Sequence, residues 1–466
     1  MFALLTLLLS CQDAQALPTF ARQTGKACAA CHLNYRELTP EGRQFKLMAY
    51  SSGNYVIPVS VEAVVSETWI KNTGSSLSPS ISLPDNGSPI FESGSLFLSG
   101  KFFQDLGGNI QWTFNTANTN PIYGTQGVQT GTRVGSDSFL DASDVRYAKK
   151  FSLGEHKAVF GFTANNAPGK QDLWVTTPVV SYPYKTSSLL NAWGIGLLGP
   201  TTLIDGGLTS QVIGEGVYTM IDDKIYAEFS NYENIDVGAK QINPSTTPNR
   251  LRYDFNPYWR LAYNHVNGNN SFLLGTFGMT TSLRRDPLIA GSASGKYLDT
   301  GFDAEYQHIT EKHSWSTQFT FINERVSWGA LSIGRSHDKQ ISDLYTFKAK
   351  VGYDYSRSFG AYTYGFFSAG TVDNLYWSYN SDPTVITGAC NQFNSRLAYC
   401  SSSGTPNTSG YGLSFYYEPI PYVHIAIQQT FYVTFLGGKQ FIDNSSGLPR
   451  SASDNNLTYM YILFSY

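Results

Sequence analysis

The stretch His424-Ile425-Ala426-Ile427-Gln428-Gln429-Thr430-Phe431-Tyr432-Val433-Thr434-Phe435 decides the fold of this chain. Successive side chains of a β-strand face opposite sides of the sheet, so the alternation predicts a strand with one apolar and one polar face. The segment from Ser314 to Phe321 alternates in the same way. The predicted apolar faces hold Ile425, Ile427, Phe431, Val433 and Phe435, and Trp315, Phe319 and Phe321; the predicted polar faces hold His424, Ala426, Gln428, Thr430 and Thr434, and Ser314, Ser316, Gln318 and Thr320.

This pattern recurs from about residue 56 to the C-terminus. Alternating segments of about ten residues, separated by turns, are typical of barrels with a lipid-facing outside and a wet lumen. We therefore predict an all-β fold, a transmembrane antiparallel β-barrel of about 16 strands. The candidate strands are 56–69, 94–104, 108–118, 141–151, 155–165, 208–219, 223–232, 255–266, 270–281, 297–308, 312–324, 342–354, 358–369, 409–418, 422–435 and 456–466.

The connections support the barrel independently, because short and long ones alternate along the chain. Outer-membrane barrels have short periplasmic turns and long outer loops, so stretches such as 166–207 and 370–408 are expected outside. The final strand ends Met460-Tyr461-Ile462-Leu463-Phe464-Ser465-Tyr466, which resembles the C-terminal signal of such barrels. We interpret the many Tyr and Trp residues as interfacial girdles. The short turns are Asp105-Leu106-Gly107, Ile221-Asp222, Asn267-Gly268-Asn269 and Pro419-Ile420-Pro421.

The composition agrees with a membrane barrel. Of 466 residues, 41% are hydrophobic, 15% aromatic and only 14% charged, and the net charge of −3 suggests no nucleic-acid partner. Residues 1–16 resemble a signal peptide whose cleavage at Ala14-Gln15-Ala16 leaves Leu17 first. Leu8-Leu9-Ser10-Cys11 also resembles a lipoprotein site, which is the alternative for this segment. No later run of about eighteen apolar residues predicts a membrane helix.

One motif is foreign to a plain barrel: Cys28-Ala29-Ala30-Cys31-His32. Two cysteines two residues apart, with histidine directly after the second, form the attachment site of one c-type haem. Cys28 and Cys31 are expected to bond covalently to the haem, and His32 to bind the iron as proximal axial ligand. A zinc site would need two more nearby ligands, and no second CxxC or HxxxH pattern accompanies this one.

Residues 17–55 form the predicted monohaem cytochrome c segment, and 56–466 the porin-like barrel. About forty residues rarely fold unaided, so we expect the barrel lumen or its periplasmic mouth to shelter the haem. Thr39 as N-cap and Pro40 in the first turn predict a short helix that brings Phe45 and Leu47 against the haem. Met48 is the candidate distal axial ligand of the iron, with water or a lumen side chain as the alternative. Arg22, Arg43 and Lys46 are candidate partners of the haem propionates, or solvated charges.

Two further groups of residues have structural interpretations. Cys390 and Cys400 lie in one long polar connection, and an exported protein favours a disulfide between them. The remaining histidines show no ligand spacing, so we interpret them as lumen or rim residues. They are His156, His265, His308, His313, His337 and His424.

The chain resembles the fused outer-membrane cytochrome–porins of iron-oxidising bacteria. The specific part is the N-terminus, and softer similarity continues through the barrel. The matching segments are Ala21-Arg22-Gln23-Thr24-Gly25, Cys28 to His32, Leu38-Thr39-Pro40, Gly42-Arg43, Phe45-Lys46-Leu47, Leu140 to Tyr147, Gln171-Asp172-Leu173-Trp174, Tyr297 to Ala304 and Ser453-Asp454-Asn455-Asn456.

The resemblance implies a single haem inside a sixteen-stranded barrel that oxidises Fe(II) at the cell surface. It implies that a periplasmic c-type cytochrome or similar acceptor takes the electron, while insoluble ferric product stays outside. It assigns haem attachment to Cys28 and Cys31 and proximal ligation to His32. The alternatives are an electron conduit for another donor or for outward flow, and a transport porin carrying a non-catalytic haem.

Overall fold

The computed structural model describes residues 17–34, 37–72, 86–123, 129–141, 143–170, 172–177, 199–235, 250–284, 294–330, 332–333, 337–378, 399–443 and 447–466. The predicted signal peptide, residues 1–16, and the alternative lipidation site at Cys11 lie outside this range.

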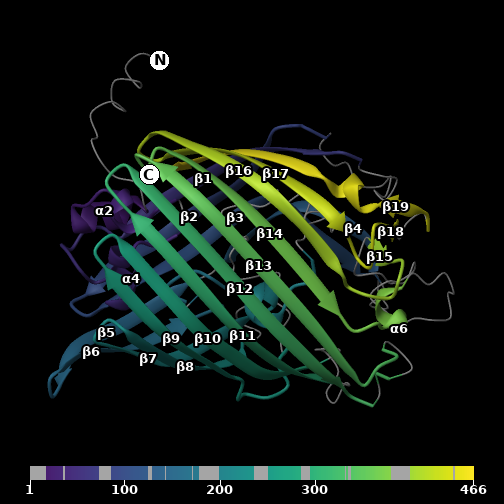
Figure 1. The fold of residues 1–466 in the computed structure, drawn as a ribbon, viewed down its shortest axis with the longest axis horizontal. Helices are drawn as coiled ribbons and strands as arrows, with labels where there is room; N and C mark the ends of the chain where they lie inside the picture. Colours follow the sequence, from purple (N-terminus) through teal and green to yellow (C-terminus); the bar gives the residue numbers. More distant parts are fainter. Residues whose placement is uncertain are drawn as a thin grey trace.

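The strands close on themselves to form an antiparallel barrel (Figure 1). Strand β1 (Val59–Ile70) pairs with β2 (Ile90–Phe103) on one side and with the C-terminal strand β20 (Leu457–Ser465) on the other. Strands β4 (Gln129–Leu140) and β5 (Asp144–Leu153) both pair with β3 (Leu106–Tyr123), one after the other, and share one position in the wall. The described residues thus form sixteen strand positions, which confirms the prediction.

The remaining strands follow in chain order, each beside its predecessor. They are β6 (His156–Asn165), β7 (Val212–Ile221), β8 (Ile225–Asn234), β9 (Pro257–Asn267), β10 (Asn270–Arg284), β11 (Ser294–Ile309), β12 (His313–Trp328), β13 (Ile341–Tyr355), β14 (Phe359–Gly370), β16 (Thr408–Ile420) and β17 (Val423–Thr434).

The predicted alternation of side chains matches the two faces of the wall. In β12, Ser314, Ser316, Gln318 and Thr320 are buried on the lumen side, whereas Trp315 is half exposed on the outside. In β17 the alternation holds up to Val433. The predicted outward position of Phe435 is wrong: the strand ends at Thr434, and Phe435 is buried against Tyr399 and Phe441.

A belt of large apolar side chains covers the outside of the strands. An apolar band of this kind is the surface that outer-membrane barrels present to lipid. The closed wall also pairs the backbone groups that hydrocarbon could not solvate. Among the described residues, no helix is long and apolar enough to span a bilayer. Examples of the belt are Leu261, Leu274, Phe302, Phe347, Phe367, Leu413 and Phe415.

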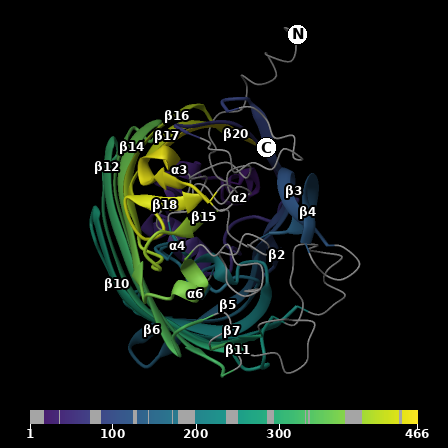
Figure 2. The same ribbon diagram turned by 90° about the vertical axis from the view of Figure 1, so that its right-hand side faces the viewer.

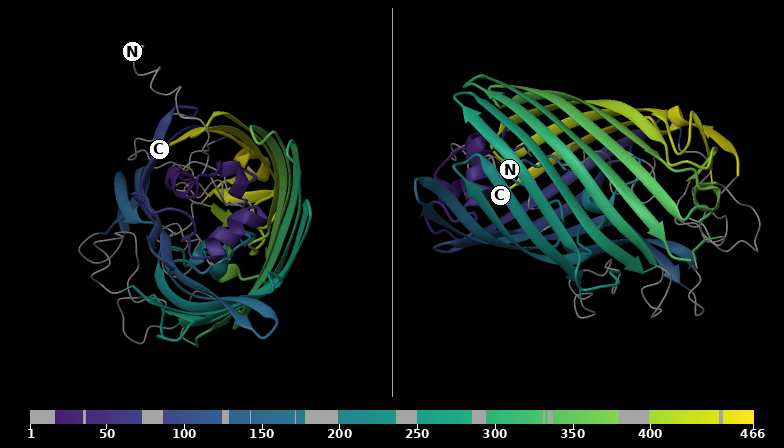
Figure 3. Two further views of the ribbon diagram at one scale, coloured as in Figure 1. Left: turned by 90° about the vertical axis from the view of Figure 1, so that its left-hand side faces the viewer. Right: turned by 60° about the horizontal axis from the view of Figure 1, so that its bottom comes forward.

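The two ends of the barrel differ. One end carries short turns, such as those at Asn267–Asn270 and Pro421–Tyr422, and the chain terminus lies at the same end. The N-terminal helices lie inside the barrel at this end, as Figure 3 shows from the open mouth. They are α2 (Pro18–Thr24), α3 (Cys28–Cys31) and α4 (Pro40–Leu47).

The connection between β6 and β7 departs from the prediction. The stretch 166–207 was expected outside the barrel, but its described parts, 166–170, 172–177 and 199–207, fold into the lumen. Leu173 and Trp174 are fully buried. The backbone amide nitrogens of Leu203 and Ile204 donate to Glu324 (2.8 Å) and Asp299 (3.0 Å) on the wall. The buried polar side chains of the wall need hydrogen-bond partners, and the backbone amides of this segment provide them.

A small sheet lies over the long-loop end, with the short helix α6 (Asn374–Trp377) beside it (Figure 2). It consists of β15 (Tyr399–Ser401), β18 (Gln440–Asp443) and β19 (Pro449–Ser451). Cys400 is fully buried in β15 and is disulfide-bonded. Its predicted partner Cys390 lies outside the described residues, so the pairing itself stays a prediction.

The outward face predicts how the barrel responds to a charge. Leu413→Arg, in the middle of β16, should lower the free energy of unfolding in lipid by about 2–4 kcal/mol, because arginine is costly near the bilayer midplane. Leu153→Arg, beside the β5–β6 turn, is the matched control and should cost about 0–1 kcal/mol. Urea titration of vesicle-inserted protein measures both, and equal losses would place Leu413 away from lipid.

Candidate haem site

The N-terminal segment folds into short helices because capping residues start them. Thr39 caps α4: its hydroxyl oxygen accepts from the amide nitrogen of Gly42 at 3.2 Å, and Pro40 occupies the first turn. The same hydroxyl donates to the carbonyl oxygen of Ala30 at 2.6 Å, which joins α4 to the haem motif. The predicted short helix and its N-cap are confirmed.

Helix α4 holds the motif closely. A Cβ atom at position 42 would collide with the backbone carbonyl of Cys31, so only glycine permits this approach. The amide nitrogen of Thr39 donates to the same carbonyl at 2.9 Å. Contacts of its backbone carbonyl therefore fix the position of Cys31, the second cysteine of the motif.

Ion pairs anchor the segment to the lumen wall. Arg43 pairs with Glu305 of β11 and donates to Ser271 of β10, and all three side chains are buried. Glu37 pairs with Lys350 of β13. Buried charges of this kind are stable only when each has its partner, so the wall specifies where the segment sits.

Hydrogen bonds from uncharged donors hold the next part of the segment. The Tyr218 hydroxyl of β7 donates to the carbonyl oxygen of Leu47 at 2.9 Å. The Tyr50 hydroxyl donates to Asp144 of β5 at 2.9 Å. Gln44 donates to Asp223, in the β7–β8 turn, at 2.5 Å. Residues 37–50 thus contact wall strands on several sides of the lumen.

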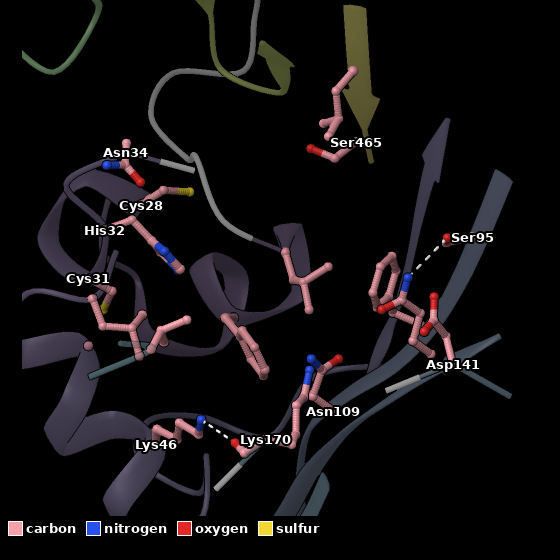
Figure 4. A pocket seen from close by; sticks show the side chains of 18 of the residues that line it. Cys28, Cys31, His32, Asn34, Lys46, Ser95, Asn109, Asp141, Lys170 and Ser465 are labelled. Atoms are coloured by element: carbon pink, nitrogen blue, oxygen red, sulfur yellow. Dashed lines mark hydrogen bonds between the residues drawn. The ribbon is translucent and has the colours of Figure 1, made fainter. Parts of the chain in front are cut away.

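A cavity of about 790 Å³ lies between this segment and the wall, and Cys28, Cys31 and His32 line it (Figure 4). Its volume lies in the range of about 300–1,000 Å³ that is usual for ligand sites. Side chains of β2 and β3 line the opposite wall, where Figure 4 labels Ser95 and Asn109. Residues of the inward-folded connection, including Asp205, also border it.

The chemistry of the three motif side chains suits a covalently bound haem. Burial lowers the pKa of His32 to about 4, which keeps the imidazole neutral and able to bind a metal. Its Nδ1 atom is buried and has no hydrogen-bond partner. Burial, followed by the nearby charge of Glu41, raises the pKa of the Cys31 thiol to about 11. Both cysteines are free thiols rather than a disulfide.

Aromatic side chains surround one part of the cavity. Phe20 lies edge-on to Phe45, with ring centroids 5.1 Å apart, and stacks on Tyr50 at 5.5 Å. All three line the cavity. A flat apolar cofactor gains contact area from such a cluster, so the residues present fit a haem. Leu47, by contrast, is buried against the barrel wall and does not line the cavity.

The structure does not bring every candidate to the cavity. Met48 packs against the wall cluster around Trp174 and does not line the cavity, so its role as distal ligand stays a prediction without structural support. Arg43 is committed to Glu305, and Arg22 donates to the carbonyl oxygen of Val59 at 2.7 Å. Of the three propionate candidates only Lys46 lines the cavity.

Lys46 is held by backbone carbonyl groups of the inward-folded connection. Its Nζ atom donates to the carbonyl oxygens of Lys170 at 2.6 Å and Asp172 at 2.9 Å. Burial, with the positive charge of Arg146 nearby, lowers the pKa of Lys46 to about 7. The Lys46 side chain is buried from solvent, so a haem propionate would give its ammonium group a charged partner.

Sequence reasoning missed the wall residues of the cavity. Glu418, Tyr422 and His424, from the hairpin of β16 and β17, line it near Cys28. They lie about 390 residues after the motif, and no sequence pattern links them to it. Asp141, directly after β4, also lines the cavity.

Comparisons with known proteins concern the barrel. The chain matches no protein-family model, and it matches no curated protein. It is similar in structure to the outer membrane protein OmpT of Vibrio cholerae (7% identity, 88% of this chain and 96% of that chain covered, TM-score 0.41). It is also similar to the outer membrane channel DcaP of Acinetobacter baumannii (8% identity, 88% of this chain and 96% of that chain covered, TM-score 0.43). A third similar structure is OmpF of Salmonella typhi in complex with daunomycin (9% identity, 88% of this chain and 97% of that chain covered, TM-score 0.44).

Identities this low concern the fold alone, and the assignment of the barrel rests on its own strand pairing and apolar belt. The chain is a porin-like β-barrel of the outer membrane whose mouth at the short-turn end holds its own N-terminal segment.

The anchoring ion pair gives a second prediction. Arg43→Ala leaves Glu305 buried without its cation, which should cost about 3–5 kcal/mol and release the N-terminal segment from the lumen. Protease cleavage within residues 17–55 should accelerate, and planar-bilayer conductance should rise. Lys26→Ala breaks an exposed pair with Glu41 and should change neither measurement, since such pairs contribute about 0–1 kcal/mol. Unchanged protection in Arg43→Ala would contradict the anchoring.

Proposed function

We propose that this protein is an outer-membrane electron-transfer protein that oxidises extracellular Fe(II) and delivers the electron to a periplasmic acceptor. The observation that carries the proposal is the gathering of Cys28, Cys31 and His32 on one cavity inside a barrel. A haem held there supplies one-electron exchange. Each Fe(II) loses one electron and becomes Fe(III), and the acceptor, a c-type cytochrome or similar carrier, gains it.

The chain's own residues bind, orient and shield. Cys28 and Cys31 would hold the haem covalently, and His32 would bind the iron with its neutral imidazole. Phe20, Phe45 and Tyr50 exclude water from one part of the cavity. Lower polarity and fewer waters around a redox centre change its potential, so these residues set it as well as hold it.

The position along the barrel favours transfer across the membrane. The hydrocarbon core is about 30 Å thick, so a single haem does not span it. The N-terminal segment lies at the end with short turns, which is the periplasmic end in outer-membrane barrels. The cavity continues from the motif to Asp205 and Lys348 on the far side of the segment. A donor that approaches through the lumen and an acceptor at the periplasmic mouth would thus meet the site from opposite sides.

Fe(II) as donor is supported by the resemblance of the N-terminal block to the cytochrome–porins of iron oxidisers. A small hydrated cation is a suitable donor for a site deep in a polar lumen. The filled mouth weighs against a plain transport porin, because the described residues 37–50 are bonded to several wall strands.

Reduction by Fe(II) tests the proposal. Oxidised, purified barrel should develop a sharp reduced c-type absorption band within seconds of adding Fe(II) alone. Cys28→Ala with Cys31→Ala should leave the barrel assembled, as judged by heat-modifiable migration in gels, but abolish haem staining and the band. Electron transfer that survives this double change would refute the haem as the functional centre.

The outcome with dithionite separates the alternatives. Haem that dithionite reduces and Fe(II) does not would refute iron as donor and support a conduit for another donor or for outward flow. Arg22→Ala, which changes an exposed contact outside the cavity, is the matched control and should reduce at the wild-type rate.

A further inference from the structure

The cavity has a second imidazole, contributed by the barrel wall. Among the described residues that line it, His32 and His424 are the histidines, and none is a methionine. His424 belongs to β17, directly after the turn from β16, and its side chain is buried. Tyr422, two residues earlier, packs against Cys28 and Ala21. The hairpin therefore closes over the motif.

His424 has the hydrogen bonding that metal-bound histidines have. Its Nδ1 atom lies 2.9 Å from the Oε1 atom of Glu418 on β16. Histidine ligands commonly donate one ring N–H to a carboxylate, which fixes the tautomer and leaves the other nitrogen as the basic one. Here Nδ1–H donates to Glu418, and the lone pair lies on Nε2.

The neighbours of His424 hold its ring in place. It stacks between Tyr416 and Tyr461, with centroids at 5.1 Å and 5.6 Å and interplanar angles of 23° and 24°. The Tyr461 hydroxyl donates to Nε2 over 3.2 Å, which is a long bond for a hydroxyl donor. A metal ion would be a stronger partner for that lone pair than this hydroxyl.

Three lysines that line the cavity are already engaged. Lys46 donates to two backbone carbonyls, Lys348 is paired with Asp205, and Lys26 is paired with Glu41. An ammonium group must also lose its proton before it binds iron, whereas imidazole is neutral near physiological pH. His424 therefore needs less rearrangement than these three lysines to bind iron.

We propose that His424 is the axial ligand on the haem face opposite His32, and that Glu418 is the residue that positions it. The proposal rests on haem attachment at Cys28 and Cys31, the first part of the proposed function, but not on Fe(II) as donor. It replaces Met48 with a side chain of the wall, so that β16 and β17 complete the haem pocket.

Spectroscopy of oxidised, haem-loaded, full-length protein in detergent tests the ligand with no Fe(II) added. Wild type should be low-spin, with the electron paramagnetic resonance of a bis-imidazole haem and without the near-infrared methionine–iron charge-transfer band. His424→Ala should become high-spin, and added imidazole should restore the low-spin signal. Met48→Leu and the rim control His308→Ala should keep the wild-type spectrum.

Glu418 has its own readout. Glu418→Gln should remain low-spin but shift the midpoint potential upward, because a neutral acceptor makes the imidazole a weaker donor to ferric iron. Glu418→Asp should recover part of the shift. A purely structural role would change thermal stability without moving the potential, and that result would overturn the positioning role.

The results that overturn the ligand are equally definite. A methionine–iron band in wild type, a high-spin wild type, or an unchanged spectrum in His424→Ala would each refute it. If His424→Ala fails to assemble, His424→Met decides, since the methionine–iron band should then appear. These measurements do not involve Fe(II) oxidation. They can therefore support His424 as ligand even if Fe(II) is not the electron donor, and they can refute His424 even if Fe(II) is the donor.

Discussion

The structure depends on one constraint: each backbone polar group inside the bilayer must find a partner within the wall. Pairing of β1 with β20 meets it by closing the sheet, which leaves no strand edge in lipid. Closure also divides every strand into an apolar outside and a polar inside. The lumen is therefore lined by hydroxyl, carboxylate and guanidinium groups that need partners of their own.

The N-terminal segment and the inward-folded connection supply those partners. Arg43 meets Glu305, Glu37 meets Lys350, and the amide of Ile204 meets Asp299. The segment also depends on the wall, because about forty residues cannot form a hydrophobic core large enough to fold independently. The wall gives it burial and fixed charges, and the segment satisfies the wall. The haem motif acquires a rigid frame through Thr39 and Gly42, which bind its backbone.

The sequence predicted what local patterns encode. Period-two alternation located all sixteen strand positions but missed β4, which pairs with the later part of β3, and Thr39-Pro40 located the start of α4. It did not predict the inward fold of residues 166–177, since Trp174 in a connection looks like any exposed aromatic until a lumen accommodates it. The predicted outward position of Phe435 was wrong for a similar reason. A small sheet at the long-loop end buries this side chain, and the strand pattern does not predict that sheet. The contacts of Cys28 with Tyr422 depend on barrel closure, which brings residues far apart in sequence together.

Barrel closure also determines how the proposed haem site would be built. His32, the proposed proximal ligand, belongs to a short inserted segment, whereas the opposite side of the cavity belongs to the barrel wall. If the iron binds His424 as proposed, cofactor binding and docking of the segment would be coupled, because a bond from the iron to β17 would tie residues 17–55 to the wall. Loss of the haem would loosen the segment, and loss of the ion pairs would loosen the haem. The proposed electron transfer and the closure of the mouth at the short-turn end would then depend on the same set of contacts.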